Sequence, residues 1–527
     1  MQRFLKYEKY LFWLLVFIHL YPVFALKLFP TLDGPTHLYN ANLLFQIISD
    51  NNGFASQFFS LKSFPVPNYT GHVLLSFFNS FLTAWLAEKV LLCSIIIALP
   101  FSFRMLLRSH EQSALFADYL IFPFIYSYTF YLGFFNFSLG VALMLITFAY
   151  WLRTENNFHR KKVIALTLLF ILLYFSHLLT FLFTGFIIGI LVLWKSFIDY
   201  LSNSKVIKDK IRKQILTLLT ATIPGLILAI LFTLQKGEES KLIYLELSEL
   251  VRWLKVVHPV ITLQYEYMES KTRYIFYTLV ILLIIIVFQR LNLYFRKKNP
   301  GIIFNDSWLL ICMILIIFYF TFPNWMSSGG HISIRILFFF YLFIILWVGL
   351  QKINKFFIII AAIIFLTISF IFLNYHYKQT KFLADGADEI YHAANFIEEN
   401  SVVLPISNSD NWMHANFSSY LAVEKEGIIV LDNYEAGKAH FPLNWRKNKS
   451  PYGVIAPDFG RNLNACHDIN EYEKASGHTV DYVFRWYYNP QSTNSCNIIT
   501  NKFIAENYNL VYTSPSGKAE VFKKRSD

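Results

Sequence analysis

Long apolar runs recur along the chain from Tyr10 to Phe372, and they limit its fold more than any other feature. A helix that crosses a bilayer needs about 20 mainly apolar residues. Charged residues make up only 15% of the chain, whereas soluble proteins carry roughly a quarter. We therefore expect a polytopic α-helical membrane protein. Eleven candidate transmembrane helices cover 9–27, 89–108, 114–130, 132–152, 163–178, 179–198, 214–235, 273–290, 306–322, 334–350 and 355–374.

A twelfth apolar stretch, YTGHVLLSFFNSFLTAWLA at 69–87, is ambiguous. Cytoplasmic loops of membrane proteins carry an excess of Lys and Arg. If 69–87 stays on the outer face and the amino terminus is cytoplasmic, 21 Lys and Arg residues fall in cytoplasmic segments and ten in outer segments before residue 375. If 69–87 crosses, this bias reverses. We therefore expect an interfacial helix on the outer face, and a carboxyl-terminal region that also lies outside.

This topology divides the chain into a transmembrane domain at 1–374, with a first outer loop at 28–88, and an extracytoplasmic α/β domain at 375–527. In the outer domain, SVVLPIS indicates a buried strand, and YNLVYTSPSGKAEVFKK indicates a hairpin with its turn at Ser-Gly. The net charge of +12 fits the Lys and Arg of cytoplasmic loops, so no nucleic-acid partner is expected.

Two further features bear on the compartment. The first 25 residues resemble a signal peptide, with a basic start, an apolar core and a Val-x-Ala ending, but an uncleaved first membrane helix is the favoured interpretation. Cys466 and Cys496 both fall in the outer domain. In an oxidising compartment they would form a disulfide that closes a loop of about 30 residues, and two free thiols are the alternative.

Polar residues of the membrane half gather on its outer face in this topology. Such groups are costly at membrane depth, so several on one side indicate a cavity. Each also has a simpler structural interpretation: helix capping for Asp33 and His177, solvation for His331, and snorkelling for Arg335. The candidate site residues are Asp33 and His37 in LDGPTHLYNA, Lys62, Asn68 and His72 in LKSFPVPNYTGH, His177 in LLYFSHLLTF, and His331 and Arg335 in PNWMSSGGHISIR.

These residue types suit transfer from a phosphate leaving group. A carboxylate at the bilayer surface can take a proton from an alcohol or amine acceptor as a general base. Nearby Lys, Arg and His side chains can neutralise a phosphate as it leaves. A lipid-phosphate-linked substrate would arrive from the membrane and a polar acceptor from outside. We expect Asp33 and His37 to be catalytic and the other six residues to bind substrate.

This layout resembles the GT-C class of integral membrane glycosyltransferases, whose donors are polyprenyl-phosphate sugars. LDGPTHLYNA looks like the acidic motif of the first outer loop, which implies that Asp33 is the catalytic base. SLKSFPVPNYTGHVLLSFF is similar to a segment of the lipid-linked aminosugar (aminoarabinose) and mannose transferases, which implies that Lys62 touches the lipid phosphate. The resemblance implies inverting transfer to an extracytoplasmic glycan, lipid or protein, in a bacterial inner membrane.

The chain departs from that class in two ways. Asp33 is followed by Gly34 rather than by a second acid, and no Asp-x-Asp motif occurs in a later outer loop. A divalent metal is therefore left open as a cofactor without support from a second acidic motif, and no other cofactor is expected. His37 is a candidate for the missing partner's role, by orienting Asp33 or the acceptor.

Other functions remain open on the sequence. A transporter or flippase for a lipid-linked glycan would need polar groups inside its spans, and most spans here are apolar throughout. An assembly protein and an acyl or phosphoethanolamine transferase are further alternatives. In LDNYEAGKAHFPLNWR of the outer domain, aromatic residues stand beside Asp432, Glu435 and His440. That composition suits glycan binding and a packed loop equally.

Overall fold

The computed structural model describes residues 2–110, 113–155, 158–201, 208–235, 242–296, 303–326, 329–456, 459, 466–488 and 495–526. The chain divides into two compact units. The helical unit consists of Met1–Tyr21 and Cys93–Tyr377, and the mixed unit consists of Pro22–Leu92 and Lys378–Asp527. Each unit therefore combines segments that are far apart in the sequence.

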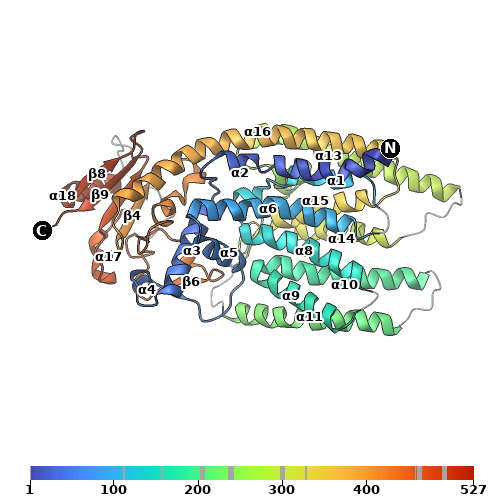
Figure 1. Ribbon diagram of the computed structural model, residues 1–527, viewed down its shortest axis with the longest axis horizontal. Coiled ribbons are helices and arrows are strands. Elements are labelled where there is room, and N and C mark those ends of the chain that lie inside the picture. The colour runs from blue at the N-terminus through green and yellow to red at the C-terminus, as the bar shows by residue number, and fades with distance from the viewer. Residues whose placement is uncertain are drawn as a thin grey trace. The chain divides into compact units, whose positions relative to one another are not determined.

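Nine helices within the described ranges are long and apolar enough to cross a membrane, which indicates an integral membrane protein. Figure 1 labels their ribbons. They are α1 (Gln2–Ile18) with α2 (Tyr21–Ala25), α6 (Ala84–Leu107), α8 (Phe135–Thr154), α10 (Leu178–Leu201), α11 (Lys208–Leu234), α13 (Tyr265–Phe295), α14 (Ser307–Thr321), α15 (Ile332–Gly349) and α16 (Lys355–Ala393).

The expected count of eleven spans is not reached among these residues, and two segments account for the difference. The segment 114–130 forms the 3-10 helix η1 (Ala117–Phe124) and the short helix α7 (Tyr128–Tyr131) instead of one span. Pro123 lies inside η1 and has no backbone N–H to donate, and the Ser127 hydroxyl caps a new helix by accepting from Phe130 N–H. The segment 163–178 forms α9 (Arg160–Ser176), a helix of 17 residues.

The ambiguous stretch 69–87 does not form a spanning helix. It contains α5 (Thr70–Asn79), which has ten residues, and the first residues of α6. A ten-residue helix is about 15 Å long, roughly half the thickness of the hydrocarbon core. Its length agrees with the expectation that this stretch does not cross the membrane.

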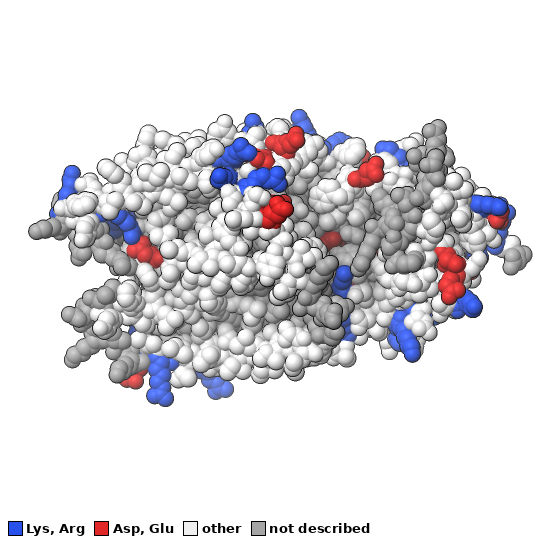
Figure 2. All heavy atoms as spheres, turned by 180° about the vertical axis from the view of Figure 1, so that it is seen from behind, with Lys and Arg blue, Asp and Glu red and all other residues white. Residues whose placement is uncertain are grey.

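α15 forms the core of the helical unit, since all its residues except Arg335 and Phe340 are buried. α14 packs directly against it. By contrast, α11 and α13 expose large apolar side chains such as Ile227, Ile284 and Phe288. Figure 2 shows a face on which Lys, Arg, Asp and Glu leave broad areas uncharged. The exposed apolar side chains of α11 and α13 are suited to contact with lipid.

The mixed unit contains a five-stranded sheet in the order β5-β4-β7-β9-β8. β4 (Val402–Ser407) is parallel to β5 (Ile429–Val430) and β7 (Tyr482–Trp486), and β9 (Ala519–Lys524) is antiparallel to β7 and β8 (Tyr508–Thr513). β4 is the expected buried strand, and β8 with β9 is the expected hairpin. The helices after β6 are α17 (Ile469–Ser476) and α18 (Ser495–Asn507).

The first outer loop belongs to the mixed unit, whereas the sequence grouped 28–88 with the transmembrane domain of 1–374. Its helix α3 (Gly34–Ser49) packs against the 3-10 helix η6 (Phe417–Ala422) and against α5. Its strand β1 (Phe59–Leu61), which follows α4 (Phe54–Phe58), pairs with β6 (Leu443–Trp445). The grouping has a physical reason: α3 is buried on nearly all sides and needs apolar partners all round.

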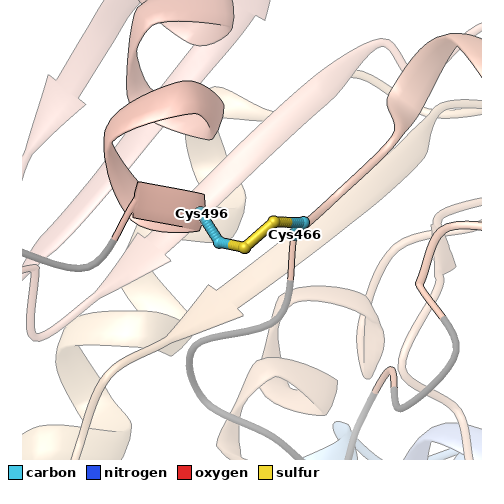
Figure 3. The surroundings of a disulfide bond; sticks show 2 residues. All are labelled: Cys466 and Cys496. Carbon is cyan, nitrogen blue, oxygen red and sulfur yellow. A yellow bond between two sulfur atoms is a disulfide. The ribbon is translucent and has the colours of Figure 1, made fainter.

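Cys466 and Cys496 form a disulfide, with their Cα atoms 4.5 Å apart (Figure 3). The bond links the residues before α17 to the start of α18, as Figure 3 shows. Cys93 and Cys312 lie in the helical unit and are not part of this disulfide. The disulfide expected from the sequence is thus present.

Candidate functional site

The site begins at the amino-terminal end of α3, where Asp33 holds the N-cap position. Pro35 follows in the first turn, and Thr31 Oγ1 accepts from the Gly34 N–H at 3.1 Å. The Asp33 side chain makes no capping hydrogen bond. Asp33 thus occupies the cap position that its sequence context suggests, but its carboxylate is not engaged in capping.

The Asp33 carboxylate instead faces the carboxyl-terminal segment of the mixed unit. Asn416 Nδ2 donates to Asp33 Oδ1 at 3.1 Å and to the Leu32 carbonyl at 2.9 Å, so one amide fixes both. The Tyr434 hydroxyl is the second neighbour. Its pKa is raised well above the usual value by burial and by the charge and hydrogen bond of Asp33, so the phenol stays protonated. Two neutral donors therefore orient this carboxylate.

His37 lies one helical turn after Asp33, and its backbone N–H donates to the Asp33 carbonyl at 3.0 Å. Its imidazole meets His72 of α5 and Glu435 of the 3-10 helix η7 (Glu435–Gly437). His37 Nδ1 lies 2.5 Å from Glu435 Oε1, and His72 Nε2 lies 2.9 Å from Glu435 Oε2. We call these three residues the His–Glu–His cluster; its ligand-type atoms all lie within 4.8 Å of one another.

The orientation of His72 is set by the backbone. Its Nδ1 lies 3.2 Å from the Asn68 carbonyl, which can only accept, so Nδ1 donates the proton in this contact. Asn68 presents that carbonyl from a left-handed conformation with φ of 62°, which asparagine adopts more readily than most residues. Asn68 therefore acts on the cluster through its main chain.

The cluster is almost completely closed to solvent: the side chains of His37, His72 and Glu435 are 5%, 1% and 1% exposed. The Phe441 ring covers both imidazoles, with ring centroids 5.6 and 5.5 Å away. Burial alone would raise the pKa of Glu435, but His37 and His72 lower it to about 2, so the carboxylate is ionised at neutral pH.

A second carboxylate, Glu88 at the start of α6, lies within electrostatic reach of His37. It is 1% exposed, and neither of its oxygens has a hydrogen-bond partner among the residues that the structure describes. The buried Tyr420 hydroxyl, which also feels the Glu88 charge, has no such partner in the described ranges either. Buried polar groups are normally hydrogen-bonded. The lack of such partners for Glu88 and Tyr420 among the described residues therefore distinguishes this region from an ordinary core.

Lys62 belongs to the mixed unit as well. Its main-chain N–H extends the β1–β6 pairing by donating to the Pro442 carbonyl at 2.9 Å. Its ammonium donates to the Lys438 carbonyl at 2.5 Å, just after η7. A cation at the carboxyl-terminal end of a helical turn is favourable, so Lys62 also stabilises the segment that carries Glu435.

The other three candidates lie in the helical unit. His177 caps the helix that follows it: its Nδ1 accepts from the Leu179 N–H at 3.2 Å. His331 is the residue before α15 and has a left-handed φ of 59°. Burial lowers the pKa of His331 to about 4, with a further contribution from Arg335, so His331 is neutral. The Arg335 guanidinium lies over the rings of Phe134 and Phe137, at 4.6 and 5.4 Å.

A basic group near His331 escaped the sequence reasoning. The His258 ring stacks on Trp253 at 4.2 Å, and burial lowers its pKa to about 3, with added effects of Arg252 and His331. Its Nδ1 is buried and without a hydrogen-bond partner in the described part of the chain. The run VRWLKVVHPV reads as an ordinary interfacial helix, so only the fold reveals this proximity.

Sequence reasoning also missed the partners of Asp33 and His37. Asn416 carries no functional signal in the sequence, and Tyr434 and Glu435 stand in LDNYEAGKAHFPLNWR, whose composition suits glycan binding and a packed loop equally. In the structure, Trp445 Nε1 donates to the Asn433 carbonyl at 3.1 Å, and Glu435 contacts His37. The acidic residue Glu435 in YEAGKAH is the signal that the sequence offers for this contact. No local pattern connects it to His37, almost 400 positions earlier.

No known protein family matches the chain, and no curated protein matches it.

Proposed function

We propose that the protein is an integral membrane glycosyltransferase that moves a sugar from a polyprenyl-phosphate donor to an extracytoplasmic acceptor, with Asp33 as the general base. The observation that carries this proposal is the state of the Asp33 carboxylate. It is half-buried at a helix start, does not cap the helix, and is oriented by Asn416 and Tyr434. A base must be held in place in this way to take a proton efficiently.

In the proposed reaction, the acceptor hydroxyl gives its proton to Asp33 while its oxygen attacks the anomeric carbon. The bond between that carbon and the phosphate oxygen breaks, and polyprenyl phosphate leaves with the bonding electrons. One displacement inverts the anomeric centre and needs one base. His37, one turn along α3, contributes by holding this end of the helix against Glu435.

The helical unit offers chemistry for the phosphate. Burial is the main cause of the lowered pKa values of His258 and His331, and nearby charges lower them further: Arg252 and His331 act on His258, and Arg335 acts on His331. Where neighbouring positive charges lower the pKa of a histidine, a bound anion offsets their effect and favours the protonated form. We therefore propose phosphate binding for this group, and keep Arg335 and His331 as donor-binding residues.

The disulfide supports an extracytoplasmic site. Cys466–Cys496 lies in the mixed unit together with Asp33, and disulfides persist mainly outside the cytoplasm. With the odd number of candidate spans among the described residues, this favours a cytoplasmic amino terminus and an outer mixed unit. The proposed membrane is the bacterial inner membrane.

The proposal is tested by supplying a panel of radiolabelled polyprenyl-phosphate sugars to membranes that contain the wild type or Asp33→Asn. Asparagine keeps the shape and the hydrogen bond from Asn416 but cannot accept the proton. Removal of a general base lowers the rate by about 10²–10⁴-fold. Asp50→Asn is the matched control, because Asp50 is exposed at the other end of the same helix.

Loss of transfer in Asp33→Asn alone supports the proposal, and the donor that is consumed names the sugar. Equal transfer by Asp33→Asn and the wild type contradicts the assignment of the base. If no donor is consumed with glycan, lipid or protein acceptors present, the glycosyltransferase proposal fails.

A transporter or flippase for a lipid-linked glycan is the second candidate, because the spans contain buried polar groups. His19 Nε2 lies 2.7 Å from the Ser369 hydroxyl, between α1 and α16. Arg104 of α6 pairs with Glu8 at 2.7 Å and with Asp118 at 2.5 Å. Buried polar groups of this kind can mark a path across a membrane. Movement of unmodified lipid-linked sugar across proteoliposomes, without transfer, would favour this function.

A further inference from the structure

We propose that His37, His72 and Glu435 bind a divalent transition-metal ion with the coordination preferences of zinc. The proposal concerns a binding site and does not depend on sugar transfer. Two imidazole nitrogens and one carboxylate are a typical protein ligand set for Zn²⁺ in sites that keep a further position open. The three ligands come from α3, α5 and η7, so a bound ion would hold together three elements of the mixed unit.

The hydrogen bonding around His72 is the first supporting observation. A histidine that binds a metal usually donates its other ring N–H to a backbone carbonyl or carboxylate, which fixes the ring. His72 Nδ1 has that partner in the Asn68 carbonyl. With the proton on Nδ1, the lone pair of Nε2 is directed at Glu435 Oε2, 2.9 Å away. Two acceptor atoms this close need a cation or an added proton between them.

His37 provides the second imidazole. Its Nδ1 lies 2.5 Å from Glu435 Oε1, and the ligand-type atoms of the three residues all lie within 4.8 Å of one another. All three residues could therefore reach one ion. Each Glu435 oxygen faces a different imidazole, so the carboxylate lies between the two histidines.

The surroundings suit a bound dication. The cluster is buried beneath Phe441, so a metal there would be shielded from competing water. The Glu435 carboxylate supplies one negative charge, which would partly balance the charge of a dication in a buried site.

The competing account is a hydrogen-bonded histidine–glutamate–histidine network that contains protons and no metal. Metal content distinguishes the two. The full chain is purified in detergent, stripped with a chelator, reloaded with Zn²⁺, desalted and analysed by mass spectrometry for metal per chain. We expect one zinc per wild-type chain and a loss of at least tenfold in His72→Gln and Glu435→Gln. His478→Gln is the control, since His478 is a histidine of the same unit that packs on Phe58 outside the cluster.

Two measurements on the wild type keep the proposal testable if the variants fail to fold. Co²⁺ added to the stripped protein should give the visible absorption of a low-symmetry site, and excess Zn²⁺ should abolish it. X-ray absorption of the zinc-loaded protein should show two histidine nitrogens and oxygen at about 2.0–2.2 Å. Wild type that retains no zinc, zinc retained equally by His72→Gln, or a zinc shell without histidine would each overturn the proposal.

Discussion

At the scale of single residues, the carboxylates of the mixed unit show how one kind of side chain takes different roles in different surroundings. Glu435 is ionised between two histidines, and the Asp33 carboxylate is oriented by neutral donors. Asp432 is different again. Burial raises its pKa to about 7, and the hydrogen bond from Ser418 to Oδ2, at 2.5 Å, only partly offsets this. Side-chain type alone therefore does not determine function here.

Asp432 leads to a prediction about pH. Its pKa in the folded protein is raised above its value in the unfolded chain, so the folded state holds the proton more tightly. The resulting contribution to stability is complete below about pH 4 and is lost as the pH rises towards about 7, at up to about 1.4 kcal/mol per pH unit. Asp432→Asn lacks this titration. The thermal midpoint of the wild type should therefore fall more between pH 4 and pH 7 than that of Asp432→Asn. Parallel curves for the two proteins would refute the assignment.

Asn68 leads to a prediction about the backbone. Its φ of 62° is costly for a side chain branched at Cβ, by about 1–2 kcal/mol, and costs glycine nothing. Asn68→Gly keeps both the conformation and the carbonyl that orients His72, whereas Asn68→Val strains them. We expect Asn68→Gly to unfold near the wild-type temperature and Asn68→Val to unfold earlier. The pair separates the role of the main chain from that of the side chain, and equal destabilisation by both would assign the effect to the lost amide.

At the scale of elements, docking of α3 onto the carboxyl-terminal segment positions Asp33 and His37. Tyr39 links the two parts, since its hydroxyl donates to the Ile428 carbonyl at 3.1 Å and accepts from the Val430 N–H at 3.0 Å. The amides of Asn40 and Asn433 exchange two hydrogen bonds of 3.0 Å each. These buried polar contacts specify one register for α3 against the segment that precedes η7.

The amide pair can be tested by a double-mutant cycle. Asn40→Ala or Asn433→Ala alone leaves a buried amide without its partner, which costs about 1–3 kcal/mol. The double variant removes both amides, so its loss of stability should be smaller than the sum of the two single losses by about 0.5–3 kcal/mol. Unfolding of the four proteins in detergent gives this coupling energy. Additive losses would show that the two amides do not stabilise α3 as a unit.

The elements also show what the sequence could predict. Local patterns predict the nine long apolar helices, strand β4 and the β8–β9 hairpin, because apolar periodicity and turn residues act over short distances. The break in 114–130 was missed, although Pro123 and Ser127 both signal it. Docking of α3 onto η6 could not be predicted, since no local feature links segments almost 400 residues apart. For the same reason, the contacts of Glu435 with His37 and His72 could not be predicted from the sequence.

At the scale of the whole molecule, the two units are assembled from alternating parts of the chain. The mixed unit joins Pro22–Leu92 to Lys378–Asp527, and the helical unit joins Met1–Tyr21 to Cys93–Tyr377. The sequence-based division has one boundary, at residue 375, whereas the compact units change at Tyr21, at Leu92 and at Tyr377. Asp33, His37, Lys62 and His72 therefore share a unit with the disulfide and Glu435.

This organisation predicts which parts of the chain are reached from outside the cell. A cysteine introduced by Ser516→Cys, in the exposed turn between β8 and β9, should react with a membrane-impermeant maleimide in intact spheroplasts. A cysteine introduced by Lys352→Cys, between α15 and α16, should react only after the membrane is opened. The reverse pattern would invert the topology and remove the basis for an extracytoplasmic acceptor.

The most direct test of the account is the turnover of purified wild type, Asp33→Asn and Asp50→Asn with the donor that the panel identifies. Release of polyprenyl phosphate is followed at saturating donor and acceptor. The account predicts that Asp33→Asn loses about 10²–10⁴-fold in kcat while KM for the donor changes little, and that Asp50→Asn matches the wild type. An Asp33→Asn enzyme that retains the wild-type kcat would contradict the central claim that Asp33 is the base.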